Sequence, residues 1–385
     1  MKNLSHRKKI ALIVTSVLMV RFFLVPHILS LSKKYDLTLI LKNDHPEILK
    51  DMNLPVRVIE IPIERKISLY RDFLALLRLV FCLKKERFDL VHTITPKAGL
   101  LGTIASWIVR CPKRIHTFQG EVWATKKGLY RILLKELDRL VAVLTTNIIV
   151  VSKTERDLLI KECVISPEKS TVLANGSISG VDLDRFKFNK EVRYDLRLQL
   201  GIEDTQIVFL YIGRLNMDKG VSELFIAFNS LIEQADNVKL LVVGVDEDDF
   251  YTKKVLNKFP NLNGYVKSVS YTETPENYMS ASDILVLPSH REGFGMVVIE
   301  SAAVGIPSIG SDIYGIQDAI VDKLTGLLFE VGNASALCKS MKLLLQNHSM
   351  RLQMGENAYQ RVVKLFNQND VIAETLKYYD ALLSD

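Results

Sequence analysis

Two acidic and two basic side chains in the second half of the chain have the types and spacing to bind a ligand. Glu292 and Glu300 belong to the stretch REGFGMVVIE, and Arg214 and Lys219 belong to GRLNMDKG. Both stretches follow apolar runs that are typical of buried strands. The fork of an arginine suits phosphate oxygens, a lysine adds a point charge, and hydroxyl groups donate hydrogen bonds to carboxylates. The four residues therefore predict a site for a ligand that carries phosphate and hydroxyl groups.

A glycine-containing segment, Gly-Phe-Gly, directly follows the first of the two glutamates. Glycine lets the chain approach a ligand closely, and the first amides of a helix have no acceptor within it. A helix is predicted over 296–304, so we expect Glu292 to reach the ligand from the loop and Glu300 from one turn inside the helix. The residues predicted to bind the ligand are Gly213, Arg214, Lys219, Glu292, Gly293, Phe294, Gly295, Met296 and Glu300.

Each of these residues also has a purely structural explanation. An acid before a helix, such as Glu292, favours the helix dipole, and Glu300 then lies on a solvated helix surface. Arg214 and Lys219 are explained in the same way as solvated charges of a loop. These explanations do not account for both pairs following strand ends beside a Gly-Phe-Gly segment. The combination favours a binding site.

The elements that must position these residues are short apolar strands separated by helical patterns. The predicted strands cover 10–15, 36–42, 56–61, 88–94, 113–118, 147–152, 206–214, 238–245, 265–271, 283–289 and 306–312. Helical spacing of apolar residues is clearest over 68–87 and 129–144. Strands that alternate with helices form parallel sheets covered on both faces. The sequence predicts an α/β protein of two doubly wound Rossmann-like domains facing across a cleft, with ligand at the carboxyl ends of the strands.

The alternation pauses once, at ANGSISGVDLDRFKFN, where glycine and aspartate break any periodicity. A chain of 385 residues is long enough for two cores. We predict a first domain over 1–178, a second over 179–368 and a C-terminal helix over 369–385 that packs back on the first domain. No internal repeat or low-complexity tract is apparent.

Composition is that of an ordinary globular enzyme, with 48% hydrophobic and 24% charged residues. The cysteines stand far apart, at Cys82, Cys111, Cys163 and Cys338. This spacing argues against a zinc knuckle, a redox pair or a disulfide framework. A reducing, cytoplasmic setting is the natural interpretation.

The N-terminal stretch HRKKIALIVTSVLMV resembles a secretory signal in its basic start and short apolar run. No small-residue cleavage site follows, and Arg21, Pro26 and His27 interrupt any extension into a spanning helix. A buried first strand followed by a helix fits this stretch better than a signal or an anchor.

Positive charge gathers in the first half of the chain: residues 1–190 carry a net charge of +15 and the remainder −9. The stretch 113–139 interleaves aromatic with basic residues, and Arg131, Lys135 and Arg139 form one polar stripe on its helix. Such a surface suits the anionic lipids of an inner membrane leaflet. A solvated basic face without a partner is the alternative. Nucleic acid is a weaker interpretation because no recognition module is present.

The paired motifs carry a family resemblance. EGFGMVVIE resembles the E-x7-E motif of retaining glycosyltransferases of the GT-B fold, in the large group 1, GT4-like family. GRLNMDKG resembles the G-R-L-x-x-x-K-G phosphate loop of that family, and SGVDLDRF resembles its N-G-V-D segment. The similarity spans nearly the whole chain, but in the first half it rests on architecture and scattered residues.

The resemblance implies a role for each matched residue. Arg214 and Lys219 would hold the diphosphate of a nucleotide-sugar donor, UDP-linked in our prediction, and offset charge on the departing nucleotide. Glu292 would contact the transferred sugar, with the amides of residues 294–296 close by, and Glu300 would bind the ribose hydroxyls. The reaction would retain the configuration of the anomeric carbon.

Two segments of the first half depart from the family pattern. A Gly-Gly loop commonly follows the first strand in this family, where this chain has TSVLMVRF, so a phosphate contact from residues 15–20 is in doubt and Arg21 is a substitute. A T-x-H-G stretch places a histidine near the donor sugar, where IHTFQG has Gln119. Gln119 can donate a hydrogen bond but cannot exchange protons. His116 is either a catalytic residue or a core histidine, and the core position is favoured.

The acidic run DEDD over 246–249 invites comparison with a metal site. It precedes a helix predicted over 250–259, so acids at a helix start explain it better. Since the resemblance implies an enzyme that needs no metal, no metal and no cofactor beyond the donor substrate are predicted.

Together these features predict a retaining glycosyltransferase, peripheral on the inner face of the cell membrane. It would move a hexosyl or N-acetylhexosaminyl group from a nucleotide-sugar to a polyprenyl-diphosphate-linked saccharide, in O-antigen, lipopolysaccharide, capsule or exopolysaccharide biosynthesis. A GT-B-like nucleotide-sugar epimerase and a non-catalytic, membrane-associated partner subunit are the alternatives. A dehydrogenase is disfavoured because the first strand is not followed by G-x-G-x-x-G.

Overall fold

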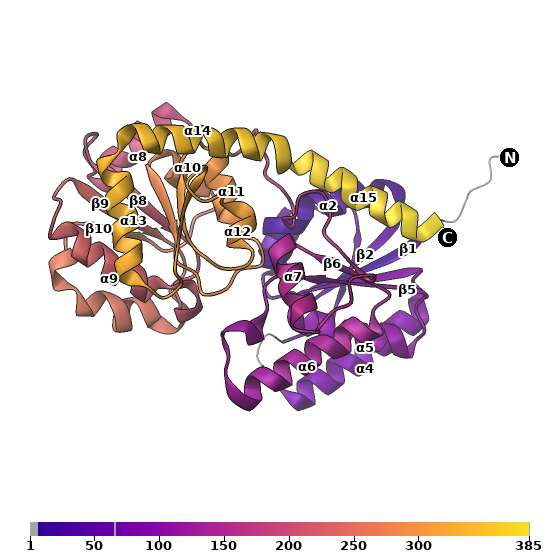
Figure 1. The fold of residues 1–385 in the computed structure, drawn as a ribbon. Coiled ribbons are helices and arrows are strands. Elements are labelled where there is room, and N and C mark those ends of the chain that lie inside the picture. The colour runs from indigo at the N-terminus through magenta and orange to yellow at the C-terminus, as the bar shows by residue number, and fades with distance from the viewer. Residues whose placement is uncertain (1–6, 65–66, 385) are drawn as a thin grey trace. The chain divides into compact units, whose positions relative to one another are not determined.

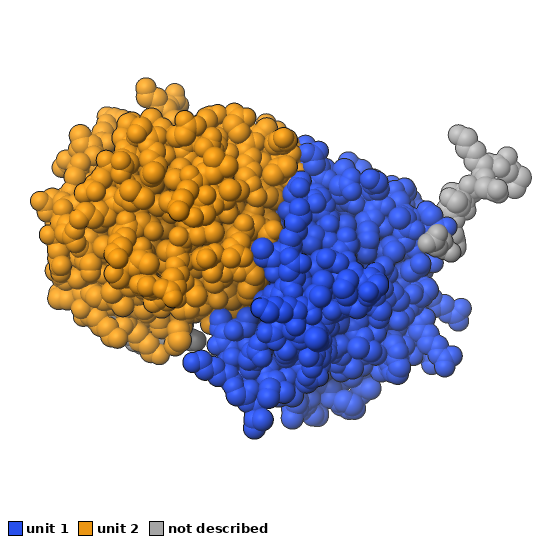
Figure 2. All heavy atoms as spheres, in the orientation of Figure 1, with its two compact units in different colours: residues 1–179, 369–385 blue, residues 180–368 orange. Residues whose placement is uncertain are grey.

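The computed structural model describes residues 7–64 and 67–384. The chain divides into two compact units, coloured separately in Figure 2. Unit 1 contains the chain up to Ser179 and again from Asn369, and unit 2 runs from Gly180 to Gln368. Each unit is built around its own parallel sheet (Figure 1).

Unit 1 has a seven-stranded parallel sheet in the order β3-β2-β1-β4-β5-β6-β7. Its strands are β1 Lys9–Ile13, β2 Asp36–Leu41, β3 Arg57–Glu60, β4 Leu90–Ile94, β5 Lys113–Phe118, β6 Asn147–Val150 and β7 Ser170–Thr171. Its helices are α1 Val17–Met19, α2 Val25–Lys34, α3 Pro46–Asp51, α4 Leu69–Glu86, α5 Pro96–Ile108, α6 Gly128–Leu144, α7 Lys153–Lys161 and α15 Gln368–Ser384. A π-helical segment, Val20–Leu24, joins α1 to α2, and a 3-10 turn, Val122–Thr125, precedes α6.

The central strand β1 shows why its residues form a strand. Ile10 and Leu12 pack into one core with α2 and α15, while Ala11 and Ile13 pack into a second core with α4 and α5. All four side chains are almost completely buried. A strand covered on both faces is a continuous apolar run rather than an alternating one, and this is the pattern that the sequence displays.

The C-terminal helix α15 is bound to the rest of unit 1 by hydrogen bonds and an ion pair. The hydroxyl of Tyr379 is hydrogen-bonded to Nδ1 of the buried His92 on β4, and Nε2 of His92 is 2.7 Å from Thr117 Oγ1. Asp380 accepts a hydrogen bond from Tyr35 and lies 2.7 Å from Lys34 Nζ. The helix therefore completes the layer that covers one face of the unit 1 sheet.

Unit 2 has a six-stranded parallel sheet in the order β10-β9-β8-β11-β12-β13. Its strands are β8 Ile207–Ile212, β9 Val238–Val243, β10 Val266–Val269, β11 Ile284–Leu287, β12 Ser308–Ser311 and β13 Gly326–Phe329. Its helices are α8 Lys190–Leu200, α9 Val221–Ile232, α10 Pro275–Ser280, α11 Met296–Ala303, α12 Ile316–Ala319, α13 Ala334–Gln346 and α14 His348–Leu365. The neighbouring strands β8 and β11 carry the candidate site at their carboxyl ends.

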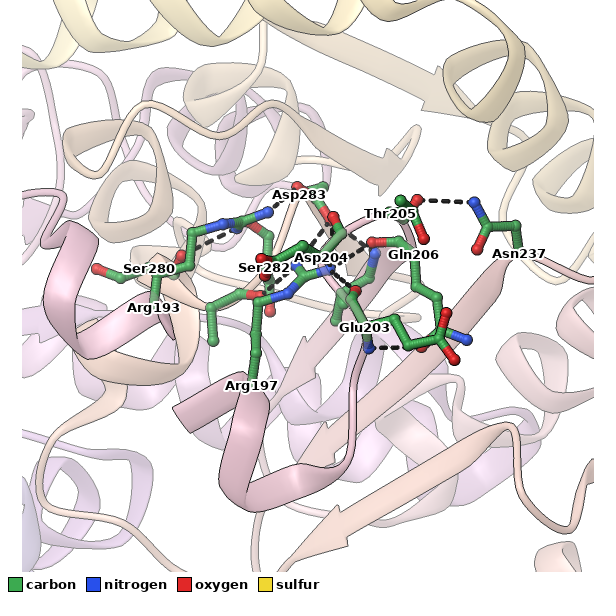
Figure 3. Close-up of polar contacts among 12 residues, drawn as sticks. Arg193, Arg197, Glu203, Asp204, Thr205, Gln206, Asn237, Ser280, Ser282 and Asp283 are labelled. Atoms are coloured by element: carbon green, nitrogen blue, oxygen red, sulfur yellow. Dashed lines mark hydrogen bonds and ion pairs between the residues drawn. The ribbon is translucent and has the colours of Figure 1, made fainter. Parts of the chain in front are cut away.

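A buried arginine fixes the other ends of β8 and β11 (Figure 3). Arg197 of α8 is 1% exposed and donates to the carbonyl oxygens of Ala281 at 3.0 Å and Gln206 at 2.5 Å. Asp283 accepts from Arg193 at 2.8 Å and from the backbone N–H of Val208 at 2.7 Å. Charge-assisted hydrogen bonds therefore hold the N-terminal ends of β8 and β11 to α8. This fixes the two strands whose carboxyl ends carry the site.

The predicted fold class is confirmed: both units are doubly wound, Rossmann-like α/β domains with parallel sheets. The observed strands other than β7 and β13 match the predicted runs, with β1 beginning one residue earlier, at Lys9, whereas β7 and β13 were not predicted. The helix predicted over 250–259 is wrong. That segment forms a π-helical turn, Phe250–Val255, and a 3-10 turn, Leu256–Lys258.

Candidate active site

The two loops of the site touch through a glycine. Gly220, before α9, has a φ of +65°, and a Cβ at this position would lie 1.9 Å from the carbonyl oxygen of Pro288. Only glycine fits so close a contact in that backbone conformation. The loop after β8 is therefore held against the loop after β11.

This contact brings Lys219 and Glu292 together. Lys219 Nζ donates to Oε1 of Glu292, and the same oxygen accepts from Ser289 Oγ at 2.8 Å. Asn216 caps the turn Met217–Lys219 by accepting the N–H of Lys219 at 3.2 Å. The glutamate predicted for a sugar and the lysine predicted for a phosphate thus form a direct ion pair.

Arg214 is paired with a carboxylate as well. Its Nη1 lies 2.9 Å from Oε1 and 3.1 Å from Oε2 of Glu247, and Asn216 Nδ2 donates to Glu247 Oε2 at 2.6 Å. The Tyr211 hydroxyl donates to the carbonyl of Arg214 at 2.7 Å. These contacts fix the backbone and the guanidinium of Arg214 at the end of β8, and the N–H of Gly213 continues the ladder to Val243 at 3.0 Å.

Glu247 corrects the interpretation of the acidic run as helix-start acids. Asp246 does accept the backbone N–H of Tyr251 at 2.7 Å, as a capping acid would. Glu247 instead binds Arg214 and Asn216. The sequence carried no signal for this, because the two loops meet only when β8 and β9 are paired in the sheet.

A second set of ion pairs surrounds the first. Arg291 Nε lies 3.1 Å from Asp218 Oδ2, and His290 Nε2 lies 3.1 Å from Glu223 Oε1. The hydrogen bond that His290 donates to Glu223 raises the pKa of His290, and the same bond lowers the pKa of Glu223. Residues 289–291 are thereby tied to the loop after β8 and to the first turn of α9.

The Gly-Phe-Gly segment leads into α11 as predicted. Gly295, with a φ of +74°, is the N-terminal cap residue of α11, and no side chain caps its amides. The ring of Phe294 is buried and packs against Phe366 with 5.2 Å between centroids. The side chain of Phe294 thus anchors the segment, while the backbone amides of Gly295 and Met296 lie at the helix start beside Glu292.

Glu300 lies within α11, and its charged neighbours are Arg185 and Glu276. Burial raises the pKa of Glu300 to about 7, the positive charge of Arg185 opposes the shift, and Glu276 adds to it. Arg185 and Glu276 form their own ion pair at 3.0 Å. Glu300 is only partly exposed, so it does not have the fully solvated position that was its alternative.

In unit 1, His116 occupies a core position. It is 3% exposed, its Nδ1 is 2.9 Å from Thr93 Oγ1, and its ring packs edge-on against Phe118 at 4.6 Å. Burial lowers the pKa of His116 to about 3. The structure therefore places His116 in the core position, which was the favoured alternative.

Gln119 is placed differently. It follows the last residue of β5 and is partly exposed, at the carboxyl edge of the unit 1 sheet. Thr15, at the end of β1, has its Oγ1 3.2 Å from that of Thr95, and α1 begins at Val17. Because Val17 and Val20 are buried in the core, little of the segment 15–20 is available as a phosphate loop.

A cluster of three carboxyl side chains, which the sequence did not reveal, forms around Glu121, two residues after Gln119. Glu121 is hydrogen-bonded to Asp138 of α6 and Glu155 of α7, and burial and both neighbours raise the pKa of Glu121. Asp138 accepts from Trp123 Nε1 at 2.9 Å, and burial raises the pKa of Asp138 to about 6. Glu155 accepts the backbone N–H of Gly120. The loop that begins at Gln119 is therefore held between two helices.

Comparison with known proteins identifies the family. Residues 192–361 match the model of group 1 glycosyl transferases, and residues 30–185 match that of glycosyltransferase family 4. The chain is 31% identical to the capsular polysaccharide biosynthesis glycosyltransferase CapM of Staphylococcus aureus, over 84% of this chain and 85% of that protein. It belongs to the group 1, GT4-type glycosyltransferases.

Another relative of this glycosyltransferase is the UDP-Gal:alpha-D-GlcNAc-diphosphoundecaprenol alpha-1,3-galactosyltransferase of Escherichia coli. The two are 30% identical over 87% of this chain and 86% of that protein. Among solved structures, HepE of Anabaena in complex with UDP and glucose has a TM-score of 0.81 at 18% identity, covering 97% of this chain and all of that one. The sucrose-phosphate synthase of Thermosynechococcus elongatus has a TM-score of 0.80 at 22% identity, covering 98% of this chain and all of that one. These structures establish a GT-B fold.

The glycosyltransferase has, within residues 7–64 and 67–384, no helix that is both long and apolar enough to cross a membrane. Over the same residues, no cluster of three or more histidine, cysteine or acidic side chains is arranged to hold a metal ion.

Proposed function

We propose that this glycosyltransferase moves a sugar from a UDP-sugar to a lipid-linked saccharide and retains the configuration at the anomeric carbon. The observation that carries the proposal is the contact between Lys219 and Glu292. It places a cation suited to a diphosphate directly beside a carboxylate suited to sugar hydroxyls. A donor in which a diphosphate joins a ribose to a sugar presents these groups in that order.

Donor binding would replace the carboxylates that now pair with Lys219 and Arg214 by the oxygens of the diphosphate. The diphosphate oxygens take the places that Glu292 holds on Lys219 and Glu247 holds on Arg214. Glu292 then accepts hydrogen bonds from the transferred sugar, while the amides at the start of α11 lie nearby. Glu300 accepts from the ribose hydroxyls.

Transfer breaks the bond between the anomeric carbon and the diphosphate, whose oxygen keeps the electron pair. Lys219 and Arg214 stabilise the negative charge that develops there. The acceptor hydroxyl forms the new bond and releases its proton. Since an amide such as Gln119 cannot take up a proton, the departing diphosphate oxygen is the acceptor for it. No metal is needed, because two cationic side chains supply the charge stabilisation.

The acceptor is proposed from the relatives. The Escherichia coli relative is named for a diphosphoundecaprenol-linked substrate and the Staphylococcus aureus relative for capsule synthesis. A polyprenyl-diphosphate-linked saccharide is the corresponding acceptor here, and the enzyme would work as a peripheral protein on the inner face of the cell membrane.

A donor screen followed by a transfer assay tests this function. In a thermal-shift panel, a UDP-sugar at 100 times its dissociation constant stabilises the protein by about 2.7 kcal/mol. The best donor is then incubated with a short-chain polyprenyl-diphosphate saccharide in EDTA, and the anomeric coupling of the product is measured by NMR. Retention and full activity in EDTA are expected. An inverted product, an absolute metal requirement, or isomerised donor formed without acceptor would contradict the proposal.

A further inference from the structure

The charged stripe of α6 faces inward. Arg131 and Lys135 bind Glu162, at 3.1 and 2.5 Å, and both cations lie over the ring of the buried Trp123. Arg139 donates to the carbonyl of Cys163 at 2.8 Å. The predicted polar stripe of α6 is therefore engaged largely within unit 1, with the side chains of Arg131, Lys135 and Arg139 33%, 15% and 34% exposed.

The opposite face of α6 turns apolar side chains to the solvent. Leu129, Ile132, Leu133 and Val143 are each more than half exposed. A surface helix of a globular protein normally buries its apolar stripe and exposes its charges. Along this face α6 departs from that rule, although Val141 and Ala142 are buried and Leu134 packs against the core.

Helix α4 shows the same feature more strongly. Tyr70, Phe73, Leu77 and Phe81 recur at helical spacing and are between 49% and 74% exposed. They form one row along the outer side of α4, because residues three and four apart share a helix face.

The exposed charges of α4 are all positive. Its two acidic residues are withdrawn: Asp72 lies 2.7 Å from Lys97 Nζ, and Glu86 lies 2.7 Å from Arg57 Nη2. The exposed charged side chains of α4 are Arg71, Arg78, Lys84 and Lys85. Arg71 lies 3.5 Å from Glu64, which precedes the helix, and Arg78, Lys84 and Lys85 complete a largely cationic border that is complementary to an anionic lipid surface.

Helices α4 and α6 share one layer. Both pack against α5, and the three helices lie side by side on one side of the unit 1 sheet (Figure 1). Trp107 and Ile108, at the end of α5, are also exposed. Isolated exposed apolar residues are ordinary, but rows on neighbouring helices form a patch that marks an interaction surface.

We propose that the outer surface of α4, α5 and α6 rests in the interfacial layer of an anionic bilayer, with Phe73, Leu77 and Phe81 inserted among the acyl chains. This deepens the peripheral membrane association of the proposed function by naming the surface and the mode of attachment, which is apolar insertion aided by charge. A second copy of the chain fits this surface poorly, because it would bring the same cations of α4 against one another.

A vesicle flotation assay tests the surface. Phe73→Ser, Leu77→Ser and Phe81→Ser are combined in one variant, and the matched control combines Leu343→Ser, Leu352→Ser and Tyr359→Ser, which replaces exposed apolar residues of α13 and α14. We expect the α4 variant to lose at least tenfold in partition to vesicles containing phosphatidylglycerol, while the control binds like the wild type. High salt should weaken wild-type binding without abolishing it. Equal binding of the α4 variant, or binding that salt abolishes completely, would overturn the proposal.

A fluorescent reporter tests insertion directly. Phe81→Trp in a Trp107→Phe background places an indole in the row, with only the buried Trp123 besides it. The emission should shift to the blue on adding anionic vesicles and be quenched by brominated acyl chains. The absence of a spectral shift would contradict insertion into the bilayer. A wild-type dimer in lipid-free solution that becomes monomeric in the α4 variant would show that this surface binds a second copy of the chain instead.

The outcome is separable from that of the proposed function. The α4 variant should transfer sugar to a short-chain acceptor in lipid-free solution as fast as the wild type, because its substitutions lie outside the donor site. Vesicle binding without any transfer would overturn the proposed function alone, and transfer without vesicle binding would overturn this proposal alone.

Discussion

Lys219 Nζ and Glu292 Oε1 are hydrogen-bonded although the residues stand 73 positions apart in the chain. The pair forms because β8 and β11 are neighbours in the sheet and their carboxyl ends meet at one edge. Without a donor, the lysine is neutralised by the carboxylate that we assign to the sugar.

Replacing either partner should damage turnover in a different way. Lys219→Ala removes a cation from the leaving diphosphate, so we expect kcat to fall by about 100-fold or more. Glu292→Gln keeps a hydrogen-bonding side chain but leaves Lys219 without its carboxylate, so donor binding should tighten or stay equal while kcat falls. Steady-state kinetics and calorimetry with the UDP-sugar separate the two effects. Near-normal kcat in both variants would remove these residues from the site.

Glu300 should make the stability of unit 2 depend on pH. Its pKa is raised from the ordinary 4.5 to about 7, so folding favours the protonated form. Relative to an ordinary glutamate, its favourable contribution is complete below about pH 4.5 and is lost as the pH rises through 7. Glu300→Gln should therefore raise the melting temperature at pH 8, by about 4 °C or more, and change it little at pH 5.

Differential scanning calorimetry at the two pH values checks this expectation. Glu356→Gln, on the exposed side of α14, is the control and should leave both melting temperatures unchanged. An equal effect of Glu300→Gln at pH 5 and pH 8 would show that its carboxyl is not the titrating group.

The carboxyl cluster of unit 1 should titrate in the same direction. Burial raises the pKa of Asp138 to about 6, and burial beside Asp138 and Glu155 raises that of Glu121, so the folded cluster retains protons that the unfolded chain releases. The cluster therefore contributes to the stability of unit 1 at low pH, and this contribution falls as the pH rises through about 6.

Glu121→Gln supplies N–H groups that need no titration, so it should stabilise unit 1 at pH 8 and not at pH 5. Glu121→Ala should destabilise the unit at both pH values, because it leaves a buried cavity and unsatisfied carboxyls. Thermal unfolding followed by the fluorescence of Trp123, in a Trp107→Phe background, measures both variants. If the melting temperatures of the wild type and of Glu121→Gln depended on pH in the same way, the protons retained by the folded cluster would not be bound through Glu121.

Gly220→Ala should disrupt the loop contact on which the site depends. The new Cβ would lie 1.9 Å from the Pro288 carbonyl at a φ of +65°, so the loops must separate. We expect a loss of about 1–3 kcal/mol in stability and a marked loss of UDP affinity. Gly305→Ala is matched in conformation, with a φ of +86° and no atom near its Cβ, and should cost less stability with unchanged affinity.

The fold and much of the candidate site could be predicted because both follow from local patterns. Parallel strands such as β1 are buried on both faces and therefore form apolar runs that stand out in the sequence. Once strands and helices alternate, the residues after strand ends must gather at one edge of the sheet, and this predicts that Lys219 and Glu292 lie close together.

The remainder could not be predicted, since it depends on which neighbours the fold supplies. Periodicity divides α6 into a charged and an apolar stripe, but Trp123 and Glu162 decide that the charged stripe turns inward. Glu247 reaches Arg214 only through the pairing of β8 with β9. The enclosure of His116 likewise depends on Thr93, a residue of the neighbouring strand.

The pairing of both site cations with carboxylates gives the candidate site built-in counterions. Any incoming anion must displace Glu292 from Lys219 and Glu247 from Arg214 before it gains their charge. Inorganic phosphate brings few hydrogen-bond donors to the released Glu292, whereas a sugar nucleotide brings the several hydroxyl groups of its sugar. Under the proposed function, the internal ion pairs would favour a sugar nucleotide over small anions at this site.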